Sequence, residues 1–250
     1  TIANISVTYQ AIEVFKNGNS IGKVNSSQEA FNTILAQDNT NAEYELVFNN
    51  MQDTMTYYLL PSGGWPEAEN IKLTSLPVEA GGGHVSISIM LYGNVTLNSN
   101  LTISGFNFTT TTNAYSQNDY SCVNLNIGSH TIYIPEEMAN IGGRLVDEYV
   151  EVNGVYETHS YNRIGLNIIG TSGSSIICDS TGDTMINGDR IIVDEIRGNF
   201  LSFNVGEARI GTLRSSLTYF KEDYNASIDN LCVSQFTLDT EAPKSYNATD

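Results

Sequence analysis

Acidic side chains gather in one short part of the sequence, and paired carboxylates are the groups that general acid and base catalysis requires. Residues 178–195 contain five of them: Asp179, Asp183, Asp189, Asp194 and Glu195. Glycoside hydrolases use two such groups on either side of the scissile bond. Asp179 and Asp194 stand at different offsets from the repeating apolar residues described below, so we expect turn corners rather than a facing pair. We assign no catalytic residue from the sequence.

Arginines offer a second kind of chemistry, an anion or uronate site. Arg197 and Arg214 each follow a repeating apolar residue by four positions. Two guanidinium groups stacked in this way would bind a carboxylate. The alternative interpretation is a solvated ladder of salt bridges, and the sequence leaves both open.

Metal and thiol chemistry have weaker support. The oxygen-rich stretches "DSTGD" and "NGD" would suit calcium, which is the one cofactor that we keep open, although no EF-hand loop occurs. The histidines are scattered, so no metal ligand is assigned. We interpret the three cysteines as buried apolar side chains, with a disulfide (Cys178 with Cys232 among the choices) or a reactive thiol as alternatives: Cys122, Cys178 and Cys232.

A short repeat must position these groups. Apolar residues recur at Ile176, Val193, Ile210 and Ile228, in nearly equal steps of about 17 residues. Second apolar bursts lie between them, so each unit holds at least two short strands. A fixed short period is typical of a solenoid, in which each unit buries its apolar face against the next. We therefore expect these four residues to point inward in one stacked row.

Alternating apolar and polar residues continue upstream with looser spacing, for example in "NIKLTSL", "CVNLNI" and "TIYI". A left-handed hexapeptide helix needs an aliphatic residue at every sixth position, and stepping by six from Ile176 reaches Gly182, Gly188 and Asp194. A leucine-rich repeat would need helical return segments. An immunoglobulin-like sandwich of short strands remains the main rival.

The beginning of the chain predicts a helix over "SSQEAFNTILAQ", residues 26–37, followed by the strand "YELVF". Ser26 is the expected N-cap and Glu29 its capping-box partner, with Phe31, Ile34 and Leu35 on one face. This order of a helix, a strand and then stacked units resembles the opening of the pectate-lyase-like β-helix superfamily. The resemblance implies that the helix covers the apolar end of the first coil, and it carries over no catalytic signature.

One insertion interrupts the pattern between "TIYI" and "RIGL". At its centre, Asn153-Gly154 stands between two alternating runs, which is a strong hairpin signal. The insertion supplies aromatic and imidazole groups beside carboxylates, a usual surface for stacking on sugars or holding a partner. The candidate ligand-binding residues are Tyr149, Tyr156, His159 and Tyr161.

Composition limits the partners. The 250 residues include 11 basic and 28 acidic side chains, for a net charge of −17. Such a surface repels phosphate backbones and anionic lipid, so we expect no nucleic-acid partner. No apolar run is long enough to span a bilayer, so we expect no membrane insertion of this fragment. The sequence starts at Thr1 without a signal peptide, and we interpret it as a mature or excised fragment.

These features predict an all-β chain that forms a right-handed parallel β-helix with a short N-terminal capping helix and an inserted β-hairpin. The expected parts are a strand and capping helix over 1–48, the β-helix over 49–238 with its insertion at 138–162, and a tail over 239–250.

The predicted function is a non-catalytic, adhesin-like module of a bacterial surface protein, extracellular or on the cell surface. Its ligand would be a carbohydrate or a host surface. Enzymatic activity stays open: the first alternative is a polysaccharide lyase or glycoside hydrolase of the β-helix class, which needs stacked Asp or Arg in one groove. The second alternative is a phage tail or spike segment, which would be an obligate trimer.

Overall fold

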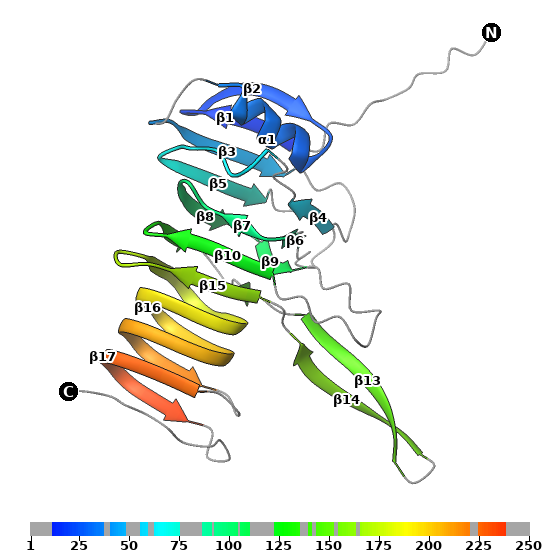
Figure 1. Cartoon of the computed structure of the whole chain (residues 1–250), viewed down its shortest axis with the longest axis vertical. Helices are drawn as coiled ribbons and strands as arrows, with labels where there is room; N and C mark the ends of the chain where they lie inside the picture. Colours follow the sequence, from blue (N-terminus) through cyan, green and yellow to red (C-terminus); the bar gives the residue numbers. More distant parts are fainter. Residues whose placement is uncertain are drawn as a thin grey trace.

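The computed structural model describes residues 12–37, 41–48, 56–59, 63–75, 87–91, 93–104, 106–110, 123–135, 140–141, 144–152, 155–163, 166–220 and 225–238. Over these ranges the chain is mostly β-strand with one helix, which confirms the expected all-β class (Figure 1). The strands form a 15-stranded sheet and a separate two-stranded hairpin.

The N-terminal end is closed by an antiparallel pair and the helix. Strand β1 (Ile12–Lys16) pairs with β2 (Asn19–Val24) and with β3 (Glu43–Phe48), both antiparallel. Helix α1 (Ser27–Leu35) begins after Ser26, whose hydroxyl oxygen accepts the amide N–H of Glu29 at 3.2 Å. The Glu29 carboxylate accepts the amide N–H of Asn25 at 3.0 Å. The predicted cap is confirmed, except that Glu29 reaches one residue further back.

One face of α1 packs on the core. Phe31 and Ile34 are buried, and the Phe31 ring lies 5.1 Å from the ring of Trp65. Leu35 is 42% exposed, so its expected place on the buried face is wrong. Residue 35 lies about 100° further around the helix than residue 34, and Ala30 completes the buried face instead.

Three parallel ladders make up the large sheet. The first ladder joins β3, β5 (Asn70–Ser75), β8 (Asn100–Ser104), β11 (Thr131–Ile134) and the start of β16 (Ser175–Phe220). The second joins β4 (Thr56–Leu59), β6 (Ile87–Leu91), β9 (Phe106–Thr110), β12 (Asn140–Ile141) and Met185–Ile186 of β16. The third joins β7 (Val95–Thr96), β10 (Val123–Gly128), β15 (Leu166–Gly170) and residues 190–192 of β16.

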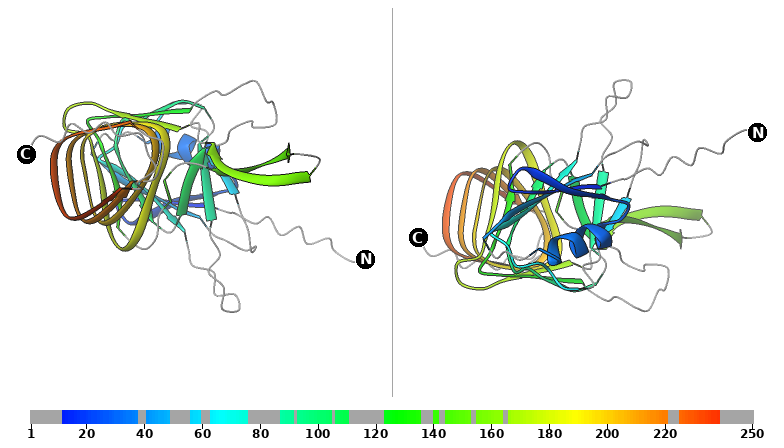
Figure 2. Two further views of the ribbon diagram at one scale, coloured as in Figure 1. Left: turned by 90° about the horizontal axis from the view of Figure 1, so that it is seen from below. Right: turned by 90° about the horizontal axis from the view of Figure 1, so that it is seen from above.

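From β5 onward the chain visits the three ladders in rotation, and we call one such passage a circuit. Strand β16 has 46 residues and bends from one ladder to the next (Figure 2). Strand β17 (Asn225–Leu238) follows it in parallel, in a register that sets Ile228 opposite Ile210. Alternate side chains of each strand point to opposite faces of the sheet, and Ile168, Ile191 and Ile210 are among the buried ones.

The four repeating residues are all buried, but they do not form one row. Ile176 lies opposite Ile132 in the first ladder, whereas Ile191, two positions before Val193, lies opposite Ile168 in the third. The amide of Glu195 donates to the carbonyl of Ser174 at 3.0 Å, and parallel pairing of this kind sets Ile196, not Val193, beside Ile176. The expected single row is wrong because the spacing between apolar residues does not say which ladder they occupy.

Parallel pairing argues against the immunoglobulin-like sandwich, whose sheets are antiparallel. In the described strands, antiparallel pairs occur only between β1 and β2, between β1 and β3, and in the hairpin. Among the same residues, no helix is long and apolar enough to cross a membrane.

A charge placed at an inward position should unfold the stack. We expect Ile210→Asp to lower the free energy of unfolding by about 3–5 kcal/mol, because an uncompensated carboxylate would enter the core. Urea denaturation measures the change. Ser216→Asp, at an exposed position of the same strand, is the matched control and should change stability by less than about 0.5 kcal/mol. Equal stability of the two variants would show that residue 210 does not face the core.

Candidate functional site

The insertion between β12 and β15 is a hairpin arm. Strands β13 (Arg144–Val152) and β14 (Val155–Arg163) pair in antiparallel register, from Arg144 opposite Arg163 to Val152 opposite Val155. This confirms the predicted hairpin, although Asn153 and Gly154 themselves lie outside the described residues. Figure 1 shows the arm projecting away from the stacked ladders.

The candidate residues of the arm occupy both of its faces. Tyr149 is opposite Thr158, and Tyr156 is opposite Glu151. Residues directly opposite each other share a face and successive residues alternate, so positions 149 and 156 fall on one face. Positions 159 and 161, which hold His159 and Tyr161, fall on the other face. The four candidate positions are therefore divided between the two faces by register, and their side chains lie outside the described part of the structure.

The two arginines of the predicted anion site differ in their surroundings. Arg214 Nε lies 3.4 Å from Glu195 Oε1, and its side chain is 58% exposed. Arg197 is also exposed, and it has no ion-pair partner among the described residues. A salt bridge at one arginine favours the solvated-ladder interpretation there over an open anion site.

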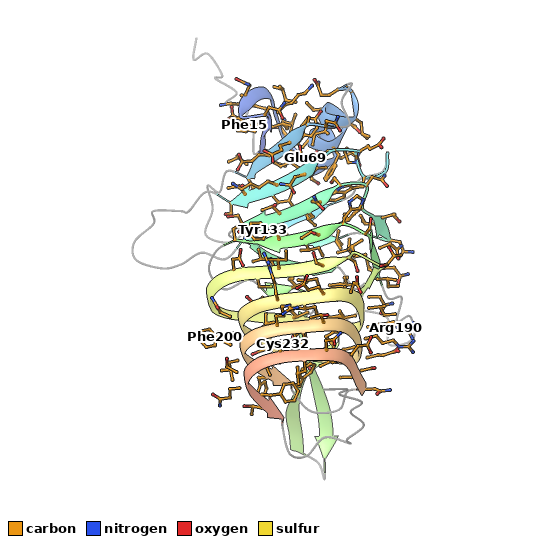
Figure 3. The ribbon with its side chains drawn as sticks, turned by 90° about the vertical axis from the view of Figure 1, so that its left-hand side faces the viewer. Phe15, Glu69, Tyr133, Arg190, Phe200 and Cys232 are labelled. Carbon is orange, nitrogen blue, oxygen red and sulfur yellow. The ribbon has the colours of Figure 1, made fainter. Side chains whose placement is uncertain are left out.

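A stronger charge network lies on the outer face of the third ladder. Arg190 Nε donates to Glu207 Oε2 at 2.7 Å, and Arg209 Nε donates to Glu207 Oε1 at 2.8 Å. Partial burial acts to raise the pKa of Glu207, but the hydrogen bonds and charges of Arg190 and Arg209 outweigh it and lower the pKa from its ordinary value. Figure 3 shows Arg190 at the edge of the stack, away from Tyr133 and Cys232.

Beside this network, a groove of about 400 Å³ runs across four successive circuits at the end of the third ladder. Its lining comes from the segment after β15, from two circuits of β16 and from β17: Gly170, Thr171, Ser172, Ile192, Val193, Asp194, Arg209, Ile210, Gly211, Ser227 and Asp229. Val193 and Ile210 form the buried floor. Carboxylates, a guanidinium group and hydroxyls stand around it.

A glycine between two aspartates shapes the groove. A Cβ at Gly211 would lie 2.6 Å from the carbonyl oxygen of Asp194, so these residues are neighbours on adjacent circuits. Asp229 follows Ile228, which lies opposite Ile210, so Asp229 stands beyond Gly211 on the next circuit. Strands are about 4.8 Å apart, which puts the Cα atoms of Asp194 and Asp229 about 10 Å apart with no side chain between them.

One carboxylate is held in a fixed orientation. Asp194 Oδ2 accepts the amide N–H of Gly173 at 2.9 Å. Asp194 Oδ1 lies 3.0 Å from the point where a Gly211 Cβ would stand, so Asp194 packs directly against Gly211 and leaves no room for a side chain there. The arrangement offers a rigid hydrogen-bond acceptor in the groove, with the Arg209 guanidinium and the hydroxyl of Ser227 nearby.

Sequence reasoning missed this site, although a signal was present. The residue after each of the last three repeating apolar residues is Asp194 after Val193, Gly211 after Ile210, and Asp229 after Ile228. Aligning these three positions from one repeat to the next would have placed Asp, Gly and Asp in one column.

The other acidic residues do not join the groove. Asp179 follows Cys178, which lies opposite Ile134 in the first ladder, so the expectation that Asp179 and Asp194 do not face each other is confirmed. The side chains of Asp183 and Asp189, and with them most of the oxygen-rich stretches considered for calcium, lie outside the described residues. Within the described residues, no group of three or more His, Cys, Asp or Glu side chains is placed to hold a metal ion.

The described cysteines are free and differ in burial. Cys178 is buried, as expected, whereas Cys232 is exposed, so its expected burial is wrong. Burial raises the pKa of the Cys178 thiol to about 12; the charge of Asp179 adds to this and a hydrogen bond with Thr184 acts against it. Cys122 lies outside the described residues.

The Glu207 network predicts a pH-dependent contribution to stability. Because the folded-state pKa is lowered, the carboxylate stabilises the fold above the ordinary glutamate pKa of about 4.3, and this contribution is lost as pH falls through the folded-state pKa. We expect Glu207→Gln to cost no more than about 1 kcal/mol near neutrality, since the ion pairs are partly exposed. Thermal melts should show the difference shrinking below about pH 4. In an Arg190→Gln, Arg209→Gln background the difference should vanish; its persistence would contradict the network.

The cysteines predict two rates of thiol labelling in a Cys122→Ser background. Cys232 should react with a thiol reagent in the folded protein at neutral pH, because it is exposed. Cys178 should react only after unfolding, because its thiol is buried and stays protonated. Mass spectrometry after a timed pulse identifies the labelled residue, and Cys232→Ser is the control that should remove the fast phase. If neither thiol reacts before reduction, the two form a disulfide, which would contradict the free thiols described above.

The groove is thus a place where functional groups gather on the described structure, and the arm carries the tyrosines and the histidine named from the sequence. Neither is assigned by similarity to a known protein. No family model matches the sequence, and no curated protein or solved structure matches the chain.

Proposed function

We propose that the circuits are the coils of a right-handed parallel β-helix. Three parallel ladders visited in rotation, with aliphatic residues inside, support this architecture. The helix at the N-terminal end of the stack supports membership of the pectate-lyase-like superfamily, since a stack of coils must cover its first apolar layer.

The function that we propose is non-catalytic carbohydrate binding by an adhesin-like, extracellular or surface-attached module of a bacterial protein. The observation that carries this proposal is the groove across four circuits, because it presents hydrogen-bonding groups in fixed positions above an apolar floor. Sugars expose hydroxyls that both donate and accept hydrogen bonds, and carboxylate, guanidinium and hydroxyl groups satisfy both roles. Sites of this kind are mostly concave and largely pre-formed.

The arm adds a second contact surface to this proposal. It lies between β12 and β15 in the sequence, and among the described strands it pairs only within itself. Tyrosines at positions 149, 156 and 161 would supply flat apolar surface for sugar rings. A ligand held in the groove would not require the arm, so the two contributions are separable.

One observation favours a second candidate function, a glycoside hydrolase. Asp194 and Asp229 lie in one groove, and their Cα atoms are about 10 Å apart by the strand spacing. Glycosidases of both stereochemical classes use a pair of carboxyl groups that flank the scissile bond. Turnover therefore has to be measured together with binding.

The test is a panel of soluble polysaccharides, with affinity measured by calorimetry and cleavage by reducing-end and unsaturated-product assays. We expect binding of at least one polysaccharide without turnover, and Asp194→Asn should weaken it about tenfold, the usual effect of losing a charge-assisted hydrogen bond. Asp179→Asn, an exposed change outside the groove, should have no effect. Clear turnover that Asp194→Asn or Asp229→Asn abolishes would establish the hydrolase instead.

A second arm of the test replaces residues 146–160 by a short Gly-Ser linker. The melting temperature should stay within a few degrees, because the core depends on the stacked circuits and not on the hairpin. Weaker binding by this deletion would assign a role to the arm, and unchanged binding would assign the ligand to the groove alone. Unfolding of the deletion variant would show that the arm belongs to the core.

A further inference from the structure

We propose that two copies of this chain meet end to end, each pairing the outer edge of its strand β17 with that of the other in a symmetric dimer. The two ends of the stack differ (Figure 1). At one end, α1 places Phe31 and Ile34 in the core. At the other end, β17 pairs with β16 alone among the described strands. The edge of β17 that faces away from β16 is therefore the surface of interest.

The core-facing side chains of β17 are less buried than those of the circuit before it. Leu213 is fully buried, whereas Leu231, which lies opposite it, is only partly buried. Phe236 continues a column of rings, with its centroid 5.5 Å from that of the fully buried Phe220, yet Phe236 is partly buried as well. The last circuit thus exposes apolar surface of the kind that the previous circuit buries, and covering it is favourable.

The sequence of β17 does not protect its edge. Edge strands usually discourage pairing with another chain by means of lysines, prolines or bulges. Strand β17 reads "NASIDNLCVSQFTL", in which Asp229 is the one charged residue and neither Pro nor Lys occurs. A protein with a net charge of −17 repels its own copies over most of its surface. This nearly uncharged edge is where a second copy meets little repulsion.

The residues that follow β17 do not read as a further strand for this edge. The stretch 239–250, "DTEAPKSYNATD", has four charged residues, one proline and no alternating apolar run. A second copy of β17, by contrast, supplies a strand of the same length and the same pattern.

The spacing of core-facing residues along β17 is the same in both directions about Cys232. Buried or partly buried side chains occupy positions 226, 228, 231, 233 and 236, and exposed pairs occupy 229–230 and 234–235. A two-fold axis through residue 232 pairs the strand with its copy in antiparallel direction. Ile228 then lies opposite Phe236 of the second copy, and Leu231 lies opposite Val233, so core-facing residues meet core-facing residues. A shift of two residues would set position 228 opposite the exposed position 234.

This register also separates the charges and limits the assembly. Asp229 lies opposite Gln235 of the second copy and not opposite the other Asp229, so like charges do not face each other. Antiparallel pairing over the strand would form about ten backbone hydrogen bonds, a number usual for a stable interface. The far end of each copy is closed by α1, so the symmetric contact stops at two copies.

Sedimentation velocity of the whole chain under reducing conditions tests the dimer. We expect a monomer–dimer equilibrium that does not grow further. Cys232→Glu should raise the dimer Kd at least tenfold, because two glutamates would face each other across the axis. In its own copy, residue 232 lies opposite Arg214, which suits a glutamate. Ser216→Glu adds the same charge at an exposed position of β16 and should leave the Kd unchanged.

Disulfide trapping tests the register. In a Cys122→Ser background, diamide should take two electrons and two protons from a pair of Cys232 thiols and link two copies, since directly opposed residues lie close to disulfide distance. A second pair checks the same register without Cys232. Asn230→Cys and Ser234→Cys, each made with Cys122→Ser and Cys232→Ser, should form the mixed disulfide between positions 230 and 234 when the two proteins are combined. Mass spectrometry identifies the linked peptides.

Every other outcome overturns the proposal. A monomer at all concentrations rules out the dimer, and growth beyond two copies, including a trimer, rules out the closed two-fold contact. A dimer that Cys232→Glu does not weaken, and in which positions 230 and 234 do not link, uses a different surface. If thermal melts show that Cys232→Glu does not fold, the mixed disulfide between positions 230 and 234 decides alone.

Discussion

The structure depends on parallel backbone pairing between successive passages of the chain. Each passage must return to the same ladder with its inward residues facing inward again. Between β16 and β17 one register is kept throughout, from Glu207 opposite Asn225 to Phe220 opposite Leu238. A shift of one residue would turn every inward side chain outward, so the register of each strand against its neighbours is fixed, whatever the length of the corner before it.

This constraint organises the outer surface into columns of polar side chains. The amide of Asn167 donates to Asn124 at 2.8 Å, and the hydroxyls of Thr131 and Ser175 lie 2.8 Å apart. Arg190 and Glu207 make a contact of the same kind between charged side chains. Each exposed contact contributes little to stability, but together they hold functional groups at intervals set by the backbone. The groove at Gly211 lies in one such column, at a position where the residue has no side chain.

Much of the architecture could be predicted because it is encoded locally. Alternation marks the strands around Ile71, Leu125 and Ile168, the Ser26 cap marks α1, and Asn153-Gly154 marks the hairpin. The ladder assignment could not be predicted, because a corner can hold extra residues: the first ladder returns at Glu195, later than the apolar spacing had suggested. For the same reason, the sequence did not predict that Asp194 and Asp229, which are brought together only by stacking, would line one groove.

The last described strand has consequences for how the protein resists force. Within the described residues, β17 is hydrogen-bonded on one side only, to β16. Tension on its end would load the backbone hydrogen bonds one after another rather than all at once. The passage between β16 and β17, in which Ile228 lies opposite Ile210, would add about 60 Å of extended chain when it is released. A structure of this kind would lengthen in steps under load, beginning at β17, and the later steps would be longer because Ser175 lies opposite Thr131 and Asn100 opposite Asn70.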